Sequence, residues 1–114
     1  MATVLESIVE GVREDLAQRK RINPLSKLRD EIAGASTAIA ASEILNSRDF
    51  SVIAEIKRAS PSKGELATIT DPRALAQEYA KGGAQIISVL TERRRFSGSL
   101  EDLVLVRKIG RAHV

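Results

Sequence analysis

The feature that most constrains this chain is a strand–loop–helix order that occurs twice in succession between residues 51 and 107. Residues 51–57 (SVIAEIK) and 85–91 (QIISVLT) have the apolar, β-branched composition of strands. Each is followed by a polar loop and then by apolar residues at helical spacing. The second strand is almost continuously apolar, as parallel strands covered on both faces are. Repeated βα units predict an α/β fold with a parallel sheet and right-handed crossovers.

Helices are expected before the first strand. Thr3 and Glu6 form the capping-box pattern that begins a first helix. Asn23-Pro24 then offers a cap and a first helical position to a second helix, and a short third helix follows. We therefore expect a helical extension over residues 1–48 and two βα units over residues 49–108.

The composition excludes several classes of protein. The chain of 114 residues has no cysteine, which excludes disulfides, thiolate metal sites and cysteine nucleophiles and fits a reducing, cytoplasmic setting. Neither a secretory signal nor the run of ~20 apolar residues that a membrane span needs is found. The net charge of +3 suits an anionic substrate as well as a nucleic acid. Phe50, Tyr79 and Phe96 are the only aromatic residues, too few for a stacking platform, so we expect no nucleic-acid partner and no membrane partner.

Two ionisable residues of opposite charge stand out in the first strand. Because side chains alternate in a strand, Ile53, Glu55 and Lys57 share one face, and Val52, Ala54 and Ile56 share the other. The second set is suited to packing against helices. Glu55 and Lys57 emerge at the carboxyl end of the strand, which is where α/β barrels carry their active sites. A structural ion pair or an exposed edge is the alternative reading of the pair.

The loop after this strand combines a stiff turn, hydroxyl groups, a cation and a flexible glycine in Ser60-Pro61-Ser62-Lys63-Gly64. Such a loop can close over an anionic substrate. From composition alone, an ordinary polar turn is an equally good reading.

Residues 52–64 (VIAEIKRASPSKG) closely resemble the signature of the indole-3-glycerol phosphate synthase family. The second unit agrees with this family in residues 87–92 (ISVLTE), 94–96 (RRF) and 98–100 (GSL). The amino-terminal helices resemble the extension that precedes the barrel in the family. The resemblance implies a (β/α)8 TIM barrel, of which this chain holds only the first two βα units, because a whole barrel takes about 250 residues.

The resemblance also implies an activity. Members of the family convert 1-(2-carboxyphenylamino)-1-deoxy-D-ribulose 5-phosphate, a phosphosugar joined to anthranilate, into indole-3-glycerol phosphate. The reaction releases carbon dioxide and water, belongs to tryptophan biosynthesis and implies no metal or organic cofactor. Association with other enzymes of that pathway is a further expectation.

Site residues follow from the same resemblance. Glu55 and Lys57 match the catalytic pair of the first strand. Lys57 is expected to hold anionic groups of the substrate and to stabilise charge during ring closure, and Glu55 to orient Lys57 and the substrate hydroxyls. Ser60 and Pro61 match the loop that lines the substrate pocket. Phe96 matches an aromatic residue near the anthranilate ring, with a loop anchor as the alternative.

The family's general-acid lysine, general-base glutamate and phosphate site lie on later strands, so we expect the chain alone to be inactive. Residues 109–114 (IGRAHV) match the translation of a common sequencing adapter, and we expect them to be a non-native tail, with a natural frameshift or a divergent tail as the alternative. Two other functions stay open: another phosphosugar-binding TIM-barrel isomerase or lyase, and a non-catalytic half-barrel module.

Overall fold

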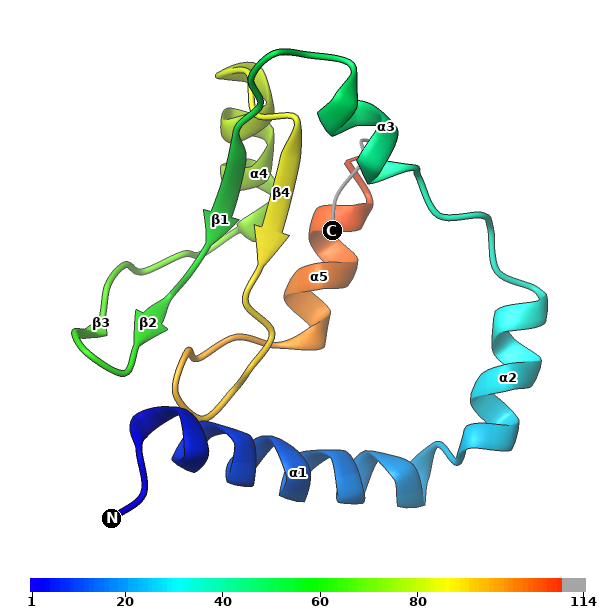
Figure 1. Cartoon of the computed structure of the whole chain (residues 1–114), viewed down its shortest axis with the longest axis vertical. Helices are drawn as coiled ribbons and strands as arrows, with labels where there is room; N and C mark the ends of the chain where they lie inside the picture. The colour runs from blue at the N-terminus through cyan, green and yellow to red at the C-terminus, as the bar shows by residue number, and fades with distance from the viewer. Residues whose placement is uncertain (110–114) are drawn as a thin grey trace. The chain divides into compact units, whose positions relative to one another are not determined.

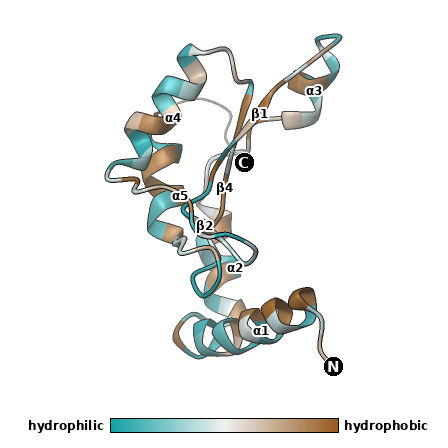
Figure 2. Cartoon of the chain, turned by 90° about the vertical axis from the view of Figure 1, so that its left-hand side faces the viewer, coloured by the Kyte–Doolittle hydropathy of each residue, from teal (hydrophilic) through white to brown (hydrophobic). Residues whose placement is uncertain are grey.

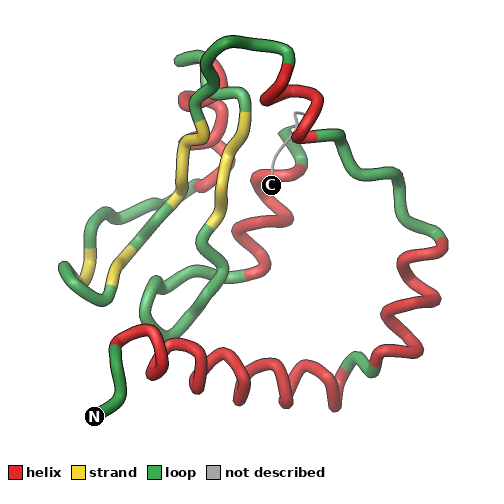
Figure 3. Tube along the Cα trace, in the orientation of Figure 1, coloured by secondary structure: helices red, strands yellow, loops and turns green. Residues whose placement is uncertain are grey.

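The computed structural model describes residues 1–109 (Figures 1 and 3). The elements, in chain order, are α1 (Val4–Ile22), α2 (Leu25–Ala33), α3 (Ala41–Asn46), β1 (Ile53–Ile56), β2 (Ala59–Ser60), β3 (Gly64–Glu65), α4 (Pro72–Lys81), β4 (Ile86–Val89) and α5 (Leu100–Arg107). Apart from Ile109, the predicted non-native tail lies outside the described residues. No helix in the described part of the chain is long and apolar enough to span a membrane.

The chain divides into two compact units, residues 1–38 and the residues from Ile39 onward. By this division α3, which the sequence groups with the extension, belongs to the second unit. The predicted boundary after residue 48, between a helical extension and a barrel segment, stays a prediction.

The first unit contains α1 and α2. The capping box predicted for α1 is confirmed, because the Thr3 hydroxyl accepts a hydrogen bond from the Glu6 N–H and the Thr3 N–H donates to the Glu6 carboxylate. The prediction that Asn23 caps α2 is wrong. The Asn23 N–H instead ends α1 by donating to the carbonyl of Arg19, and Pro24 takes the cap position of α2. Apolar and polar residues collect on different sides of α1 (Figure 2).

The second unit is built on a pair of parallel strands. β1 and β4 run in register from Ile53 opposite Ile86 to Ile56 opposite Val89. The helices α4 and α5 lie on one side of this pair (Figures 1 and 2) and contribute to its core. This arrangement confirms the predicted parallel βα units.

The two faces of β1 differ as alternation predicts. Ile56 is only 2% exposed and lies in a core cluster, whereas Ile53 on the opposite face is 56% exposed. The cluster consists of Ile56, Ala76, Ile87 and Val106. Glu55 and Lys57 therefore belong to the face that the helices leave open.

The segment after β1 is more ordered than the sequence predicts. β2 and β3 pair as a short antiparallel hairpin, with Ser60 opposite Gly64. The Ser60 hydroxyl accepts a hydrogen bond from the Lys63 N–H, and Gly64 has a φ of +65°, which glycine adopts without strain. The prediction of a loop after the first strand is wrong in this respect, because two-residue strands are too short to show alternation.

Candidate active site

The carboxyl ends of β1 and β4 bring three polar side chains together. Glu55 lies opposite Ser88 in the parallel register, and Lys57 follows directly after β1. The Nζ atom of Lys57 is 3.1 Å from Oε1 of Glu55, and the Ser88 hydroxyl donates to Oε2 of Glu55 at 3.2 Å. Both Glu55 oxygens are therefore engaged, which fixes the carboxylate between the two strands.

Phe96 completes this group from the loop between β4 and α5. The Lys57 Nζ atom lies 5.9 Å from the centroid of the Phe96 ring, within cation–π range. The structure thus brings together Glu55, Lys57 and Phe96. The side chains of Lys57 and Glu55 are 36% and 40% exposed, so the ammonium group is oriented yet open to an approaching anion.

The hairpin residues form a separate group. The Ser60 hydroxyl lies 3.5 Å from that of Ser62 and accepts from the Lys63 N–H, so its contacts stay within the hairpin. Within residues 1–109, no hydrogen bond or ion pair joins Ser60 or Pro61 to Glu55 or Lys57. Their role in lining a substrate pocket stays a prediction.

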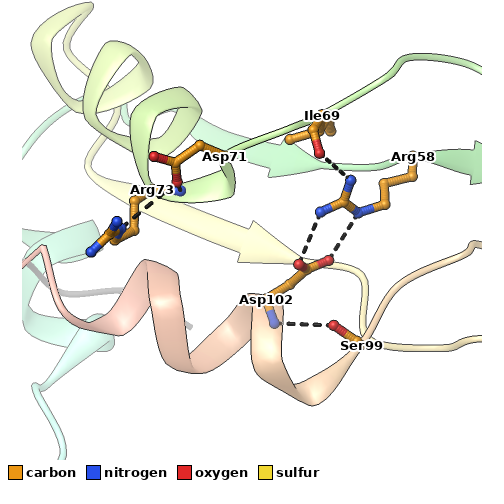
Figure 4. Close-up of polar contacts among 6 residues, drawn as sticks. All are labelled: Arg58, Ile69, Asp71, Arg73, Ser99 and Asp102. Atoms are coloured by element: carbon orange, nitrogen blue, oxygen red, sulfur yellow. Dashed lines mark hydrogen bonds and ion pairs between the residues drawn. The ribbon is translucent and has the colours of Figure 1, made fainter.

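Arg58 makes the most extensive polar contact in this region, and sequence reasoning missed it (Figure 4). Its Nε and Nη2 atoms donate to the two carboxylate oxygens of Asp102 at 3.0 and 2.9 Å, and Nη1 donates to the carbonyl of Ile69. The side chains of Arg58 and Asp102 are only 24% and 11% exposed. The hydrogen bonds that the Arg58 guanidinium donates to the Asp102 carboxylate raise the pKa of Arg58 above its ordinary value.

This contact ties three parts of the second unit together. Arg58 comes from the short link between β1 and β2, Ile69 from the segment before α4, and Asp102 from the first turn of α5. The Asp102 N–H is itself capped by the Ser99 hydroxyl at 3.1 Å. The sequence marks Asp102 only as an acidic residue in a first helical turn, and nothing in a single sequence pairs it with Arg58.

A hollow of about 530 Å³ lies between the hairpin and the loop after β4. It is lined by Arg58, Ala59, Gly64, Glu65, Ala67, Thr68, Ile69, Arg95 and Ser97. Lys57 does not line it, so among the described residues this hollow is distinct from the group at Glu55 and Lys57.

Residues 1–109 hold no group of three histidine, cysteine or acidic side chains placed to bind a metal ion. The expectation that the protein needs no metal or organic cofactor stays a prediction.

The chain matches the family model of indole-3-glycerol phosphate synthase over residues 5–114. A protein of Beutenbergia cavernae named indole-3-glycerol phosphate synthase is 54% identical over 106 residues, which cover 92% of this chain and 39% of that relative. Relatives of the same name from Mycobacterium leprae and Kineococcus radiotolerans are each 56% identical, over 93% and 92% of this chain and 39% and 40% of their own lengths.

The chain therefore spans about two fifths of the length of the curated relatives that it matches. The predicted similarity is confirmed along almost all of the chain, well beyond the motif around Glu55 and Lys57. The family's barrel fold agrees with the parallel βα units described above. On these grounds the chain belongs to the indole-3-glycerol phosphate synthase family.

Proposed function

We propose that this chain is the amino-terminal part of an enzyme that converts 1-(2-carboxyphenylamino)-1-deoxy-D-ribulose 5-phosphate into indole-3-glycerol phosphate, with loss of carbon dioxide and water. The observation that carries the proposal is the placement of Lys57. Its ammonium group is held by Glu55 and faces the Phe96 ring at the carboxyl ends of parallel strands. Active sites of α/β barrels form at this end.

Each residue has a role in the proposal. Lys57 attracts anionic groups of the substrate and stabilises charge as the ring closes, because a fixed ammonium group needs little reorganisation during the reaction. Glu55 orients Lys57 and accepts hydrogen bonds from substrate hydroxyls. Phe96 packs near the anthranilate ring. Ser60 and Pro61 line the pocket from the hairpin.

Ring closure also needs proton transfer and phosphate anchoring. By resemblance to the family, the general acid, the general base and the phosphate site come from strands beyond the two parallel strands of this chain. The proposal therefore assigns substrate orientation and charge stabilisation to this segment. It also includes a cytoplasmic location, no nucleic-acid or membrane partner, and association with other enzymes of tryptophan biosynthesis.

A hybrid synthase tests the proposal. Residues 5–109 of this chain replace the matching segment of the Kineococcus radiotolerans relative, which is 56% identical here. We expect the purified hybrid to form indole-3-glycerol phosphate and to restore growth without tryptophan in a strain that lacks the enzyme. A folded hybrid with no such activity, or one active only on another phosphosugar, would contradict the proposal and favour a binding module or a different isomerase or lyase.

A further inference from the structure

Glu92, which the proposed mechanism does not use, organises the loop that carries Phe96. One carboxylate oxygen of Glu92 accepts the N–H of Arg94 at 3.1 Å. The other accepts the N–H groups of Arg95 and Phe96 at 2.7 and 3.0 Å. A single carboxylate thus satisfies three successive backbone donors, and the last of them belongs to Phe96. Hydrogen bonds to a charged acceptor are about twice as strong as neutral ones.

The backbone closes around this carboxylate. The Glu92 carbonyl accepts a hydrogen bond from the Gly98 N–H at 2.9 Å. Ser97, which directly precedes Gly98, has a φ of +54°. A Cβ atom on Gly98 would lie 1.8 Å from the carbonyl oxygen of Leu90, so the chain passes its own strand end at a distance that only glycine allows. The loop is therefore held at both ends and has little freedom to rearrange.

The consequence appears at Lys57. Because Glu92 fixes the backbone of Phe96, the centroid of the Phe96 ring lies 5.9 Å from the Lys57 Nζ atom. A mobile loop would present this aromatic face only part of the time, and positional errors of about 1 Å can lower a rate by ~100-fold.

We propose that Glu92 is a positioning residue for the reaction: its carboxylate fixes the loop so that Phe96 meets Lys57. The expected effect of Glu92 on turnover rests on the proposed function. Glu92 touches neither the reacting groups nor Lys57 in this account and acts through Phe96. The competing view is that Glu92 only stabilises a surface loop.

The substitution Glu92→Gln in the hybrid synthase separates these views. Glutamine keeps the length of the side chain but offers one uncharged acceptor oxygen in place of two charged ones, and its amide N–H₂ then faces a backbone N–H group, so the anchor is weakened. We expect kcat to fall about 10-fold or more while the protein stays folded. The matched control is Glu78→Gln, because Glu78 is 70% exposed and forms an exposed ion pair with Lys81. It should leave kcat unchanged.

A double-mutant cycle identifies the route. In a Phe96→Ala background, Glu92→Gln should lower kcat by no more than about 2-fold, because its effect passes through the missing ring. An equal loss of kcat with and without Phe96 overturns the proposal. So does a lower thermal midpoint with unchanged kcat.

A second readout does not depend on activity. In lysine-labelled hybrid, the Phe96 ring should shift the ¹³C and ¹H resonances of the Lys57 ε-methylene group. Phe96→Leu should abolish that shift, and Glu92→Gln should reduce it. An unreduced shift in Glu92→Gln overturns the positioning role. If the unsubstituted hybrid were inactive, the proposed function would fail while this spectrum still decided the role of Glu92.

Discussion

Asp102→Asn should destabilise the protein far more than an ordinary surface substitution. Asparagine leaves the Arg58 guanidinium with one oxygen acceptor and places an amide N–H₂ against the other donor. Breaking a fully buried ion pair costs about 3–5 kcal/mol. Because Arg58 is 24% exposed and keeps the carbonyl of Ile69 as a partner, we expect a smaller loss of about 2–3 kcal/mol.

Thermal unfolding of the hybrid synthase, followed by circular dichroism, measures this loss. At the size of the hybrid, a loss of this magnitude lowers the midpoint by about 4–12 °C. The control Glu78→Gln breaks an exposed ion pair and should lower stability by at most ~1 kcal/mol. Similar midpoints for Asp102→Asn and Glu78→Gln would show that the contact with Arg58 contributes nothing.

The raised pKa of Arg58 also fixes the sign of a pH effect. A base with a raised pKa contributes stability that is complete below its ordinary pKa, which for arginine lies far above neutral pH, and that is lost only as the pH rises through the still higher folded-state pKa. The midpoint difference between the unsubstituted hybrid and Asp102→Asn should therefore be the same at about pH 7 and about pH 9, because Arg58 stays charged at both.

Three further predictions follow. Gly98→Ala should lower the turnover of the hybrid by about 10-fold or more, because the new Cβ atom would lie 1.8 Å from the Leu90 carbonyl oxygen and the loop must move. The hydrogen bonds with Thr3 lower the pKa of Glu6 below 4.5. The contribution of the capping box to stability is therefore complete above pH 4.5 and is lost as the pH falls through the folded-state pKa of Glu6. Thr3→Ala should raise the pKa of Glu6 in a ¹³C NMR titration. The 114-residue chain expressed alone should form no indole-3-glycerol phosphate in a direct product assay, and measurable product would refute this expectation.

Local sequence patterns predict much of this fold. The period of two separates buried Ile56 from exposed Ile53, and the capping residue Thr3 marks a helix start that the structure confirms. These features depend on neighbours within a few residues. The family motif then predicts Glu55 and Lys57 as site residues, and the strand pairing explains why they emerge at one edge.

Features that depend on distant residues are not predicted in this way. Ser88 meets Glu55 only because β1 and β4 pair in one register, and Arg58 meets Asp102 across 44 residues of sequence. The hydrogen bonds from three backbone N–H groups to Glu92 depend on the conformation of the loop, which side-chain periodicity does not predict. Tertiary register and backbone turns therefore supply the part of the site that sequence patterns leave out.

The most direct test of the account compares Lys57→Ala with Lys81→Ala in the hybrid synthase. Each substitution removes one lysine from a Lys–Glu ion pair, but only Lys57 lies in the proposed site. The Lys57 pair is more than one third exposed, and Glu55 keeps the Ser88 hydroxyl, so the loss of stability should be at most ~1 kcal/mol. We expect turnover to fall about 100-fold or more for Lys57→Ala and to stay unchanged for Lys81→Ala. A clearly lower thermal midpoint with near-normal turnover of folded Lys57→Ala protein would show that Lys57 is structural and contradict the account.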